Sequence, residues 1–513
     1  MIGAESLVRT LIASGVDACF ANPGTSEMHF VAALDRASGM RSVLGLFEGV
    51  VTGAADAYAR MTGKPAATLM HCGPGLANGL SLLHNAKRAR VPIVNIVGDE
   101  ATYHEPLDPP LTTDTEGLAR PVSAWVRKVK RTEVLGSEAA AAVAAARETS
   151  GIATLILPSD VSWNEGGVVG TPLPVPPRSK APDESIREAA RVLRQREETL
   201  ILMSGAALSE AGLMIAYRIA SATGARLSAQ TFNTRVARGR GRYPIQRVPY
   251  FVDEAVKENA GVKHLILAGT GMPVTFFAYP NKPGMATPPD AKVHVLARTE
   301  DDVVDALARL ADELGAPDVP VADRPAPDVR RGRITPEGAS ETLAALLPDS
   351  SIIIEEAITL RNFFFNALTN AAPHDSLENI GGAIGAGPPL ATGAAIAAPG
   401  RRVVGVQADG SAMYTIQALW TQARENLDVT TVVLSNNKYA VLFRELAAVG
   451  ATPGKTANDL FEINRPDLDW LRLSESMGVE AARAETLDQF ADLLRYSFAR
   501  KGPFLIELVI DRG

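Results

Sequence analysis

An α/β fold with three doubly wound, parallel-sheet domains is predicted by three features of the sequence. Short apolar strands alternate with helical segments along nearly the whole chain, a pattern typical of parallel sheets covered on both faces. Two proline-rich segments, 171–183 and 316–329, interrupt this alternation and are typical of extended linkers. The length of 513 residues also favours about three domains. We therefore predict domains over 1–170, 184–315 and 334–513.

Each predicted domain contains apolar strands that end in loops rich in glycine, proline or asparagine. The first domain opens with an amphipathic helix at 4–14, and its strands are expected at 16–20, 42–46, 66–71, 92–97 and 152–157. The strands of the second domain are expected at 199–203, 226–228, 264–268 and 292–296. Those of the third are expected at 351–355, 402–406, 430–434 and 504–509. Parallel sheets bind ligands outside the carboxyl ends of their strands, so the residues that follow these strands are candidates for a functional site.

The composition excludes several classes of function. The net charge is −7, and no run of Lys or Arg favours binding to nucleic acid or to an anionic membrane. The two cysteines, Cys19 and Cys72, exclude a disulfide framework. Cys72 follows His71, but no second Cys or cluster of His accompanies it, which argues against a nucleophilic or metal-binding thiol. A secretory signal and a stretch of roughly 20 apolar residues are also absent from the sequence, so a cytoplasmic location is expected.

The segment 402–442 is the most informative part of the sequence. An apolar strand ends at Asp409, a helix follows, and a second apolar strand ends at Asn437. Both side chains are therefore expected at the same edge of a parallel sheet. A carboxylate, an amide oxygen and the backbone carbonyl of Tyr439 are the hard oxygen ligands that Mg²⁺ prefers. The alternative is a plain strand–turn–helix with a loop Asp, but the complete pattern favours a metal site.

The residues after Asp409 favour a diphosphate beside this metal. Gly410 allows close approach of the backbone, and a helix expected near Ser411 directs N–H groups and its positive end toward the phosphates. The segment resembles the cofactor motif of thiamine-diphosphate enzymes, which has Gly-Asp-Gly followed by Asn-Asn. Ala408 replaces the first glycine here, and this replacement matters if the position requires a positive φ.

The resemblance extends over nearly the whole chain and is to the acetolactate synthase, pyruvate oxidase and benzoylformate decarboxylase group. It implies that the first domain binds the aminopyrimidine ring, that the third binds the diphosphate with Mg²⁺, and that the central domain has a related fold. It also implies an active site between two chains, in a homodimer or a homotetramer that acts on a small 2-oxo acid.

Two further segments resemble the parts of this family that activate the cofactor. FEGVVTGAADAYARMTGKP, which contains Glu48, is similar to the family's activating-glutamate helix. The resemblance implies that Glu48 shares a proton with the pyrimidine ring, although a Glu at the start of a helix is also favoured by the helix dipole alone. In GGAIGAG (381–387), Ile384 is at the position of the bulky residue that bends the cofactor, with a core isoleucine as the alternative.

The substrate end resembles benzoylformate decarboxylase only in part. The loops NPGTSE (22–27) and HCGPGLANG (71–79) imply that Thr25 binds the substrate carboxylate and that His71 transfers protons, since an imidazole exchanges protons near neutral pH. Helix capping by Thr25 and a structural His71 are the alternatives. His104 is a second candidate near this cleft, with an exposed loop residue as its alternative. The second histidine of that decarboxylase has no counterpart in 269–280, where Phe276 and Phe277 stand instead.

The resemblance therefore implies a 2-oxo acid decarboxylase or carboligase similar to acetolactate synthase. Loss of CO₂ forms an enamine, which is passed to a proton or to a second carbonyl compound. A non-oxidative decarboxylase like benzoylformate decarboxylase and a 2-hydroxyacyl-CoA lyase are the alternatives, and the choice of donor and acceptor stays open. Glycines at three strand ends, Gly205, Gly269 and Gly271, leave FAD as a less favoured additional cofactor. A non-catalytic homologue is disfavoured because Glu48, Asp409 and Asn437 are all present.

Overall fold

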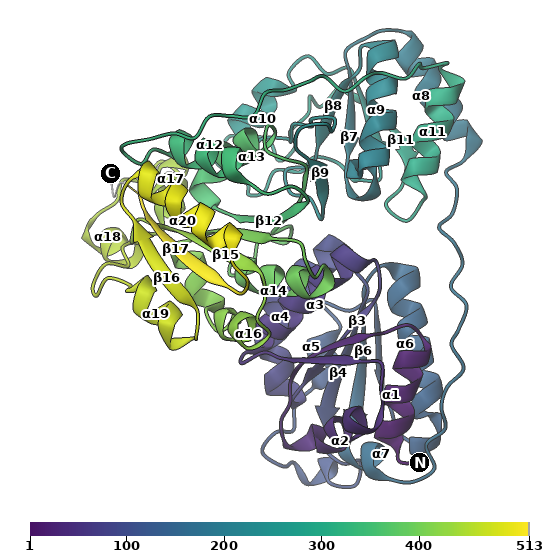
Figure 1. Ribbon diagram of the computed structural model, residues 1–513. Helices are drawn as coiled ribbons and strands as arrows, with labels where there is room; N and C mark the ends of the chain where they lie inside the picture. Colours follow the sequence, from purple (N-terminus) through teal and green to yellow (C-terminus); the bar gives the residue numbers. More distant parts are fainter. Residues whose placement is uncertain (511–513) are drawn as a thin grey trace.

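The computed structural model of this protein describes residues 1–510 and contains three sheets with helices on both faces (Figure 1). All strand pairs are parallel except that of β9 with β13. The predicted fold class is confirmed. Each of the thirteen predicted strands overlaps an observed one, and β5, β9, β13 and β16 are additional. An extended segment, 164–182, runs along the outside of the molecule from the first sheet to the second (Figure 1). No helix within residues 1–510 is both long enough and apolar enough to cross a lipid bilayer.

The first sheet has six parallel strands in the order β2-β1-β3-β4-β6-β5. Its strands are β1 (Ala18–Asn22), β2 (Arg41–Leu44), β3 (Ala66–Met70), β4 (Ile93–Asp99), β5 (Trp125–Lys128) and β6 (Ile152–Pro158). One face packs against α1 (Gly3–Ala13), α2 (Met28–Arg36), α6 (Leu135–Thr149) and α7 (Ser159–Trp163). The other face packs against α3 (Glu48–Thr62), α4 (Cys72–Ala89) and α5 (Thr115–Ala119).

The second sheet has four parallel strands in the order β11-β10-β7-β8. They are β7 (Thr199–Met203), β8 (Arg226–Ala229), β10 (His264–Ala268) and β11 (Lys292–Ala297). Its helices are α8 (Asp183–Arg194), α9 (Glu210–Thr223), α10 (Val252–Glu258) and α11 (Val303–Glu313). β7 and β10 have no exposed residue because helices cover both of their faces.

The third sheet has seven strands in the order β16-β17-β15-β14-β12-β13-β9. They are β9 (Val236–Arg238), β12 (Ser351–Glu356), β13 (His374–Glu378), β14 (Val403–Ala408), β15 (Val429–Ser435), β16 (Glu480–Ala484) and β17 (Phe504–Val509). Its longer helices are α12 (Pro336–Leu346), α13 (Arg361–Leu368), α14 (Gly387–Ala397), α17 (Ala440–Ala448) and α20 (Leu487–Ala499). The shorter ones are α15 (Asp409–Ala412), α16 (Ala418–Arg424), α18 (Lys455–Phe461) and α19 (Trp470–Ser476).

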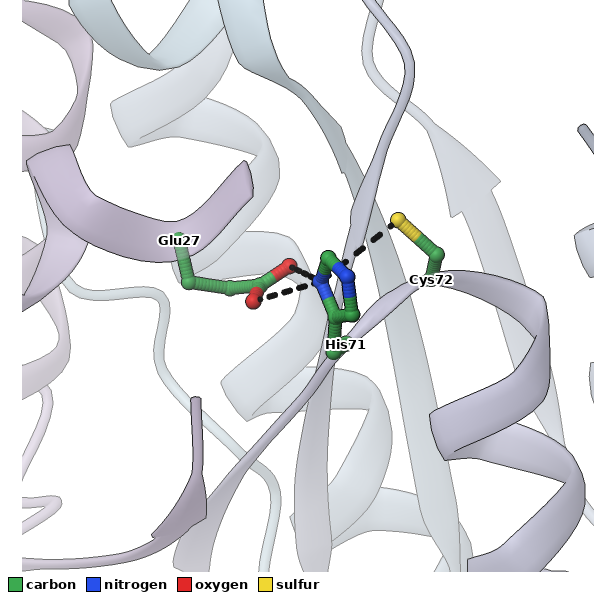
Figure 2. A group of neighbouring side chains, drawn as sticks. All are labelled: Glu27, His71 and Cys72. Carbon is green, nitrogen blue, oxygen red and sulfur yellow. Dashed lines mark hydrogen bonds and ion pairs between the residues drawn. The ribbon is translucent and has the colours of Figure 1, made fainter. Parts of the chain in front are cut away.

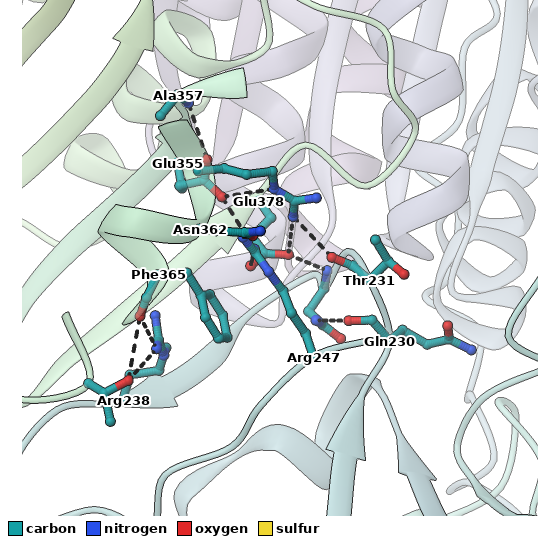
Figure 3. Close-up of polar contacts among 12 residues, drawn as sticks. Gln230, Thr231, Arg238, Arg247, Glu355, Ala357, Asn362, Phe365 and Glu378 are labelled. Carbon is teal, nitrogen blue, oxygen red and sulfur yellow. Dashed lines mark hydrogen bonds and ion pairs between the residues drawn. The ribbon is translucent and has the colours of Figure 1, made fainter. Parts of the chain in front are cut away.

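Strand β9 departs from the predicted arrangement, because it comes from the central segment of the chain but pairs antiparallel with β13 of the third sheet. Buried charges hold this crossing in place (Figure 3). The guanidinium of Arg247 donates to Glu378 at 2.8 Å and lies 3.4 Å from Glu355. Arg238 on β9 stacks over the ring of Phe365 at 3.7 Å. Removing one partner of such a buried ion pair costs about 3–5 kcal/mol, so the central segment is firmly anchored to the third sheet.

Helices α3 and α14 form the contact between the first and third sheets (Figure 1). Glycines allow them to pack closely, since a Cβ on Gly393 would lie 1.9 Å from the carbonyl oxygen of Ala54. On α3, a Cβ on Gly53 would lie 2.6 Å from Pro389. The small residues of the helix that Glu48 begins, such as Gly53 and Ala54, therefore allow this packing.

Candidate functional site

Thr25, His71 and His104 come together at the carboxyl edge of the first sheet, where they line one cavity of about 330 Å³. They follow β1, β3 and β4, as the strand pattern predicts. Thr25 does not cap a helix, because Gly24 is the N-cap residue of the short helix Thr25–Glu27. His104 is exposed in the loop after β4, whereas His71 is half-buried.

A carboxylate holds His71 in this cavity (Figure 2). His71 Nδ1 lies 3.0 Å from Oε2 of Glu27, which is almost completely buried. Glu27 also accepts hydrogen bonds from the hydroxyl of Ser26 and from the backbone N–H of Gly24, the latter at 2.7 Å. When Nδ1–H donates to Glu27, the Nε2 atom of His71 is left for proton exchange. Glu27 was not predicted as a site residue, although it belongs to the NPGTSE loop.

The glycine run after His71 forms the start of α4 rather than a loop, and Glu48, at the start of α3, lies beside its first turn. A Cβ on Gly75 would lie 3.2 Å from Glu48 Oε1 and 3.5 Å from the Cβ of His71, so both side chains flank this glycine. Glu48 is 7% exposed and accepts a hydrogen bond of 3.0 Å from the side chain of Asn78. Asn78 lies one helical turn after Gly75 and was not predicted as a site residue.

The predicted metal ligands come together at the carboxyl edge of the third sheet. Asp409 follows β14 and Asn437 follows the adjacent β15, and both side chains are buried. One oxygen of Asp409 accepts N–H groups from Asn436 and Asn437, at 2.8 and 2.6 Å, and the other accepts the N–H of Gly410 at 2.8 Å. Tyr439 is the N-cap residue of α17, and its ring lies against Gly410.

The donors of this cluster fit a hard divalent cation. Burial raises the pKa of the Asp409 carboxyl even though three N–H groups donate to it, and a cation in contact would offset this penalty. Oδ1 of Asp409 accepts only the N–H of Gly410 and keeps a further lone pair, so a metal can bind this oxygen without breaking these hydrogen bonds. Asp409, Asn437 and the carbonyl of Tyr439 are therefore suitable to hold Mg²⁺.

Two details of the diphosphate segment differ from expectation. The helix begins at Asp409 rather than near Ser411, and a 3₁₀ turn interrupts it before α16. The Ser411 hydroxyl accordingly donates to the carbonyl of Ala408, at 3.0 Å. Ala408 has φ −74°, so the replacement of the usual glycine creates no backbone strain.

The loop that carries Ile384 is organised by a buried carboxylate that the sequence analysis did not identify. Glu356, at the end of β12, accepts the backbone N–H groups of Gly385, Ala386 and Gly387 at 2.9–3.3 Å. Burial raises the pKa of Glu356 to about 7. Ile384 is half-buried beside these amides. The hydroxyl of Thr415 donates to the Gly385 carbonyl at 2.7 Å, which ties this loop to the diphosphate segment.

Residues other than glycine with a positive φ, which strains the backbone, follow strands at the carboxyl edges of the first and third sheets. Cys72 after β3 has φ +51°, and Ile358 after β12 has φ +46°, a conformation that a β-branched residue rarely adopts. Asn437 after β15 has φ +56°, which asparagine tolerates better. Such residues concentrate at functional sites because the surrounding structure must hold them in place.

Within one chain these two edges are far apart. On α4, Gly75 lies beside Glu48, but Asn85, ten residues later, hydrogen-bonds with both the N–H and the carbonyl of Ala383. Ten residues of helix span about 15 Å. Helix α3 runs in the same direction as α4. Glu48 is at its start, and Arg60, near its end, donates to the carbonyl of Glu378. Glu48 and Ile384 therefore do not meet within a single chain.

The glycine-rich strand ends of the central domain line a different cavity. Gly205, Gly269 and Gly271 border a cleft of about 1700 Å³ between the sheets, together with Phe276. Gly205 and Gly269 follow strands β7 and β10 and have φ of +59° and +68°, a conformation that glycine adopts without strain. Phe276 also lies against Gly382, close to the loop that carries Ile384.

Comparison with known proteins gives the class that this fold and site define. Residues 1–118 match the thiamine pyrophosphate enzyme, N-terminal TPP binding domain, and residues 362–508 match the C-terminal TPP binding domain. A protein of Mycobacterium tuberculosis (strain ATCC 25618 / H37Rv), named "Putative acetolactate synthase large subunit IlvX", is 50% identical over 99% of both chains. The chain therefore belongs to the thiamine pyrophosphate enzyme family and contains its cofactor-binding domains.

Two more distant relatives carry the names of the two enzyme types predicted from the sequence, a decarboxylase and an acetolactate synthase. Benzoylformate decarboxylase of Pseudomonas aeruginosa (strain PAO1) is 27% identical over 96% of both chains. Acetolactate synthase isozyme 1 large subunit of Escherichia coli (strain K12) is 24% identical over 99% of this chain and 94% of its own. The solved benzoylformate decarboxylase of Polynucleobacter necessarius superposes with a TM-score of 0.85 at 22% identity, covering 100% of this chain and 99% of its own, which shows the shared fold.

Proposed function

We propose that this protein is a thiamine-diphosphate- and Mg²⁺-dependent enzyme that decarboxylates a 2-oxo acid. The observation that carries the proposal is the Glu27–His71 pair beside Glu48, at the edge of the domain that matches the N-terminal TPP binding domain. Decarboxylation leaves a carbon atom that must take up a proton, and a histidine held by a carboxylate is suited to deliver one.

The third sheet supplies the residues that would hold the cofactor. Asp409, Asn437 and the Tyr439 carbonyl would bind Mg²⁺, with the backbone of Gly410 and Ser411 close to the diphosphate. Ile384 would support the bend between the two rings of the cofactor. When bound, thiamine diphosphate supplies the carbon nucleophile and the electron sink for loss of CO₂.

The first sheet supplies the proton chemistry. Glu48 would hold a proton at N1′ of the pyrimidine, with Asn78 fixing the direction of its carboxylate. The exposed Thr25 hydroxyl would orient the substrate carboxylate at the mouth of the cavity. His71 Nε2 would exchange a proton with the reacting carbon, and His104 would border the same space.

Carboligation, in which a second carbonyl compound takes the place of the proton, is the second candidate. The relative at 50% identity, named as an acetolactate synthase large subunit, favours it. A product-resolved assay separates the two reactions: the protein, thiamine diphosphate and Mg²⁺ are supplied with pyruvate or benzoylformate, with and without an acceptor aldehyde. We expect CO₂ and an aldehyde. Acetolactate from pyruvate alone would make carboligation the principal reaction, and no CO₂ from any 2-oxo acid would refute the proposal.

The distance between the two edges supports an active site formed by two chains. Glu48 of one chain and Ile384 of another would face the same cofactor in a homodimer or in a homotetramer of paired dimers. Apolar side chains lie exposed beside both halves: Leu46 near Glu48, and Tyr414 and Leu442 near Asp409. A second chain would cover them.

Mixed oligomers test this arrangement. Glu48→Gln and Asp409→Ala chains are each expected to be inactive, but one site of a mixed dimer would have neither substitution. Random mixing of equal amounts should restore about one quarter of the wild-type activity. No recovery from demonstrably mixed oligomers would place Glu48 and Asp409 in the same chain's site.

A further inference from the structure

Three side chains with different donor atoms converge at the floor of the His71 cavity. The carboxylate of Glu27, Nδ1 of His71 and Sγ of Cys72 all lie within 4.8 Å of one another (Figure 2). Nδ1 lies 3.0 Å from the Glu27 carboxylate and 3.7 Å from the Cys72 sulfur. These separations are close to those between neighbouring ligands of a tetrahedral Zn²⁺ ion with bonds of about 2.0–2.3 Å.

We propose that Glu27, His71 and Cys72 form a binding site for Zn²⁺ or a similar transition-metal cation, separate from the Asp409 site, and that occupancy turns off His71. A thiolate and an imidazole favour Zn²⁺ over Mg²⁺, which prefers oxygen ligands. The third ligand comes from a different loop, following β1 rather than β3. The sequence shows His71 and Cys72 as neighbours but does not show that Glu27 joins them.

The surroundings allow a metal ion to enter. The Ser26 oxygen lies between the three donors, 2.9 Å from His71 Nδ1 and 3.3 Å from the Cys72 sulfur, and it also donates to Glu27. Rotation of this hydroxyl to another staggered rotamer vacates the position between the ligands. A water molecule from the cavity can then complete a four-coordinate metal.

Binding is an exchange of protons for the metal. The Cys72 thiol loses its proton to solvent when the S–Zn bond forms, and the Nδ1 proton of neutral His71 moves to Nε2. Because binding releases the thiol proton, it should strengthen as the pH rises. With Nδ1 on the metal, the remaining proton occupies Nε2, and no lone pair is left to accept another.

The metal site itself stands on geometry alone, whereas inhibition also rests on the proposed role of His71. Both can be measured on the full-length protein loaded with thiamine diphosphate and Mg²⁺. Titration with Co²⁺ should produce a thiolate-to-cobalt charge-transfer band with one equivalent bound, and Zn²⁺ should remove the band by competition. Zn²⁺ should inhibit turnover at the concentrations at which it displaces Co²⁺, and a chelator should restore activity.

The two cysteines provide a matched pair of variants. Cys72→Ala should abolish the band and weaken Zn²⁺ binding by about 100-fold or more, since even partners outside the ligand shell contribute 10–100-fold. Cys19→Ala removes the other buried thiol, on β1, and should keep the band. Glu27→Gln should weaken binding while both thiols remain.

Each outcome separates the metal site from the catalytic proposal. A wild-type protein without the band, or a Cys72→Ala protein that binds as tightly as wild type, would overturn the metal site. A band that depends on Cys72 without inhibition would establish the site and refute the role of His71 in turnover.

Discussion

The His71 cavity and the Asp409 cluster occupy equivalent places in two similar sheets but differ in chemistry. Both lie at the carboxyl edge of a parallel sheet, where ligands of doubly wound folds bind. The Asp409 cluster presents only oxygen ligands and backbone N–H groups, whereas the His71 cavity presents nitrogen, sulfur and carboxylate groups. The fold thus provides two similar edges with different side chains: oxygen ligands suited to Mg²⁺ at one, and a histidine–carboxylate pair suited to proton transfer at the other.

The two edges also differ in whether the residues proposed to act together lie within one sheet. Asp409 and Asn437 belong to adjacent strands and are joined by a hydrogen bond of 2.6 Å, so the metal site can form within one sheet. Glu48 and His71 flank Gly75 but lie about 15 Å, measured along α4, from the loop that carries Ile384. Under the proposed function, the His71 edge would therefore need a second chain to reach the cofactor.

Among substitutions at the carboxyl edge of the first sheet, Glu48→Gln is expected to have the largest effect on turnover. The variant keeps the size of the side chain but cannot share a proton with the pyrimidine, and general acid–base catalysis contributes roughly 10²–10⁴-fold. We expect kcat to fall by about 1000-fold while thiamine diphosphate still binds. Steady-state kinetics and calorimetric titration check these two expectations. Turnover close to wild type would remove Glu48 from the mechanism.

Asp409→Ala should instead act through cofactor binding. At 100 times its Kd, a ligand stabilises the folded state by about 2.7 kcal/mol, and this gain should vanish when the metal ligand is lost. The measurement is the shift in Tm on adding thiamine diphosphate with Mg²⁺. Glu48→Gln is the matched control and should keep most of the shift. An unchanged shift in Asp409→Ala would refute the metal site.

His71→Ala and Glu27→Gln should have graded effects. Loss of the imidazole should reduce kcat by about 100-fold, and loss of the Glu27 charge by about 10-fold, since the histidine then keeps its place but loses its orienting partner. Product analysis provides the second measurement, because impaired protonation should increase carboligation when an acceptor aldehyde is present. Equal effects on protonation and carboligation would indicate that the pair only stabilises the structure.

Much of the fold, and the proximity of Asp409 and Asn437, could be predicted because their signals are local. Apolar strands and the spacing of Asp409 and Asn437 depend on residues close together in the sequence. Strand β13 was missed because His374, Asp375 and Glu378 are polar, and they become buried only through partners such as Arg247 and Arg401. These partners lie elsewhere in the chain, so the strand has no apolar pattern to detect.

The supporting carboxylates escaped prediction for a related reason. Glu27 and Glu356 lie at ends of regular elements, where an exposed Glu is common, and only their folded surroundings show what they bind. Glu27 meets a histidine 44 residues later, and Glu356 meets amides about 30 residues later. The roles assigned to all the candidate site residues remain predictions: Glu48, Thr25, His71, His104 and Ile384, and equally Asp409, Gly410, Ser411, Asn437 and Tyr439.

Glu356 gives the smallest expected effect and tests the Ile384 loop. Its pKa is raised from 4.5 to about 7 by burial, so between these values the folded state binds a proton that the unfolded chain does not. Folding stability should therefore fall as the pH rises through this window, and Glu356→Gln should remove that part of the dependence. The difference between the Tm of the variant and that of wild type should therefore shift by a few degrees in favour of the variant when the pH is raised from 5 to 8. A constant difference would mean that Glu356 is ionised throughout, held by the amides of Gly385 and Gly387, and that the loop is insensitive to pH.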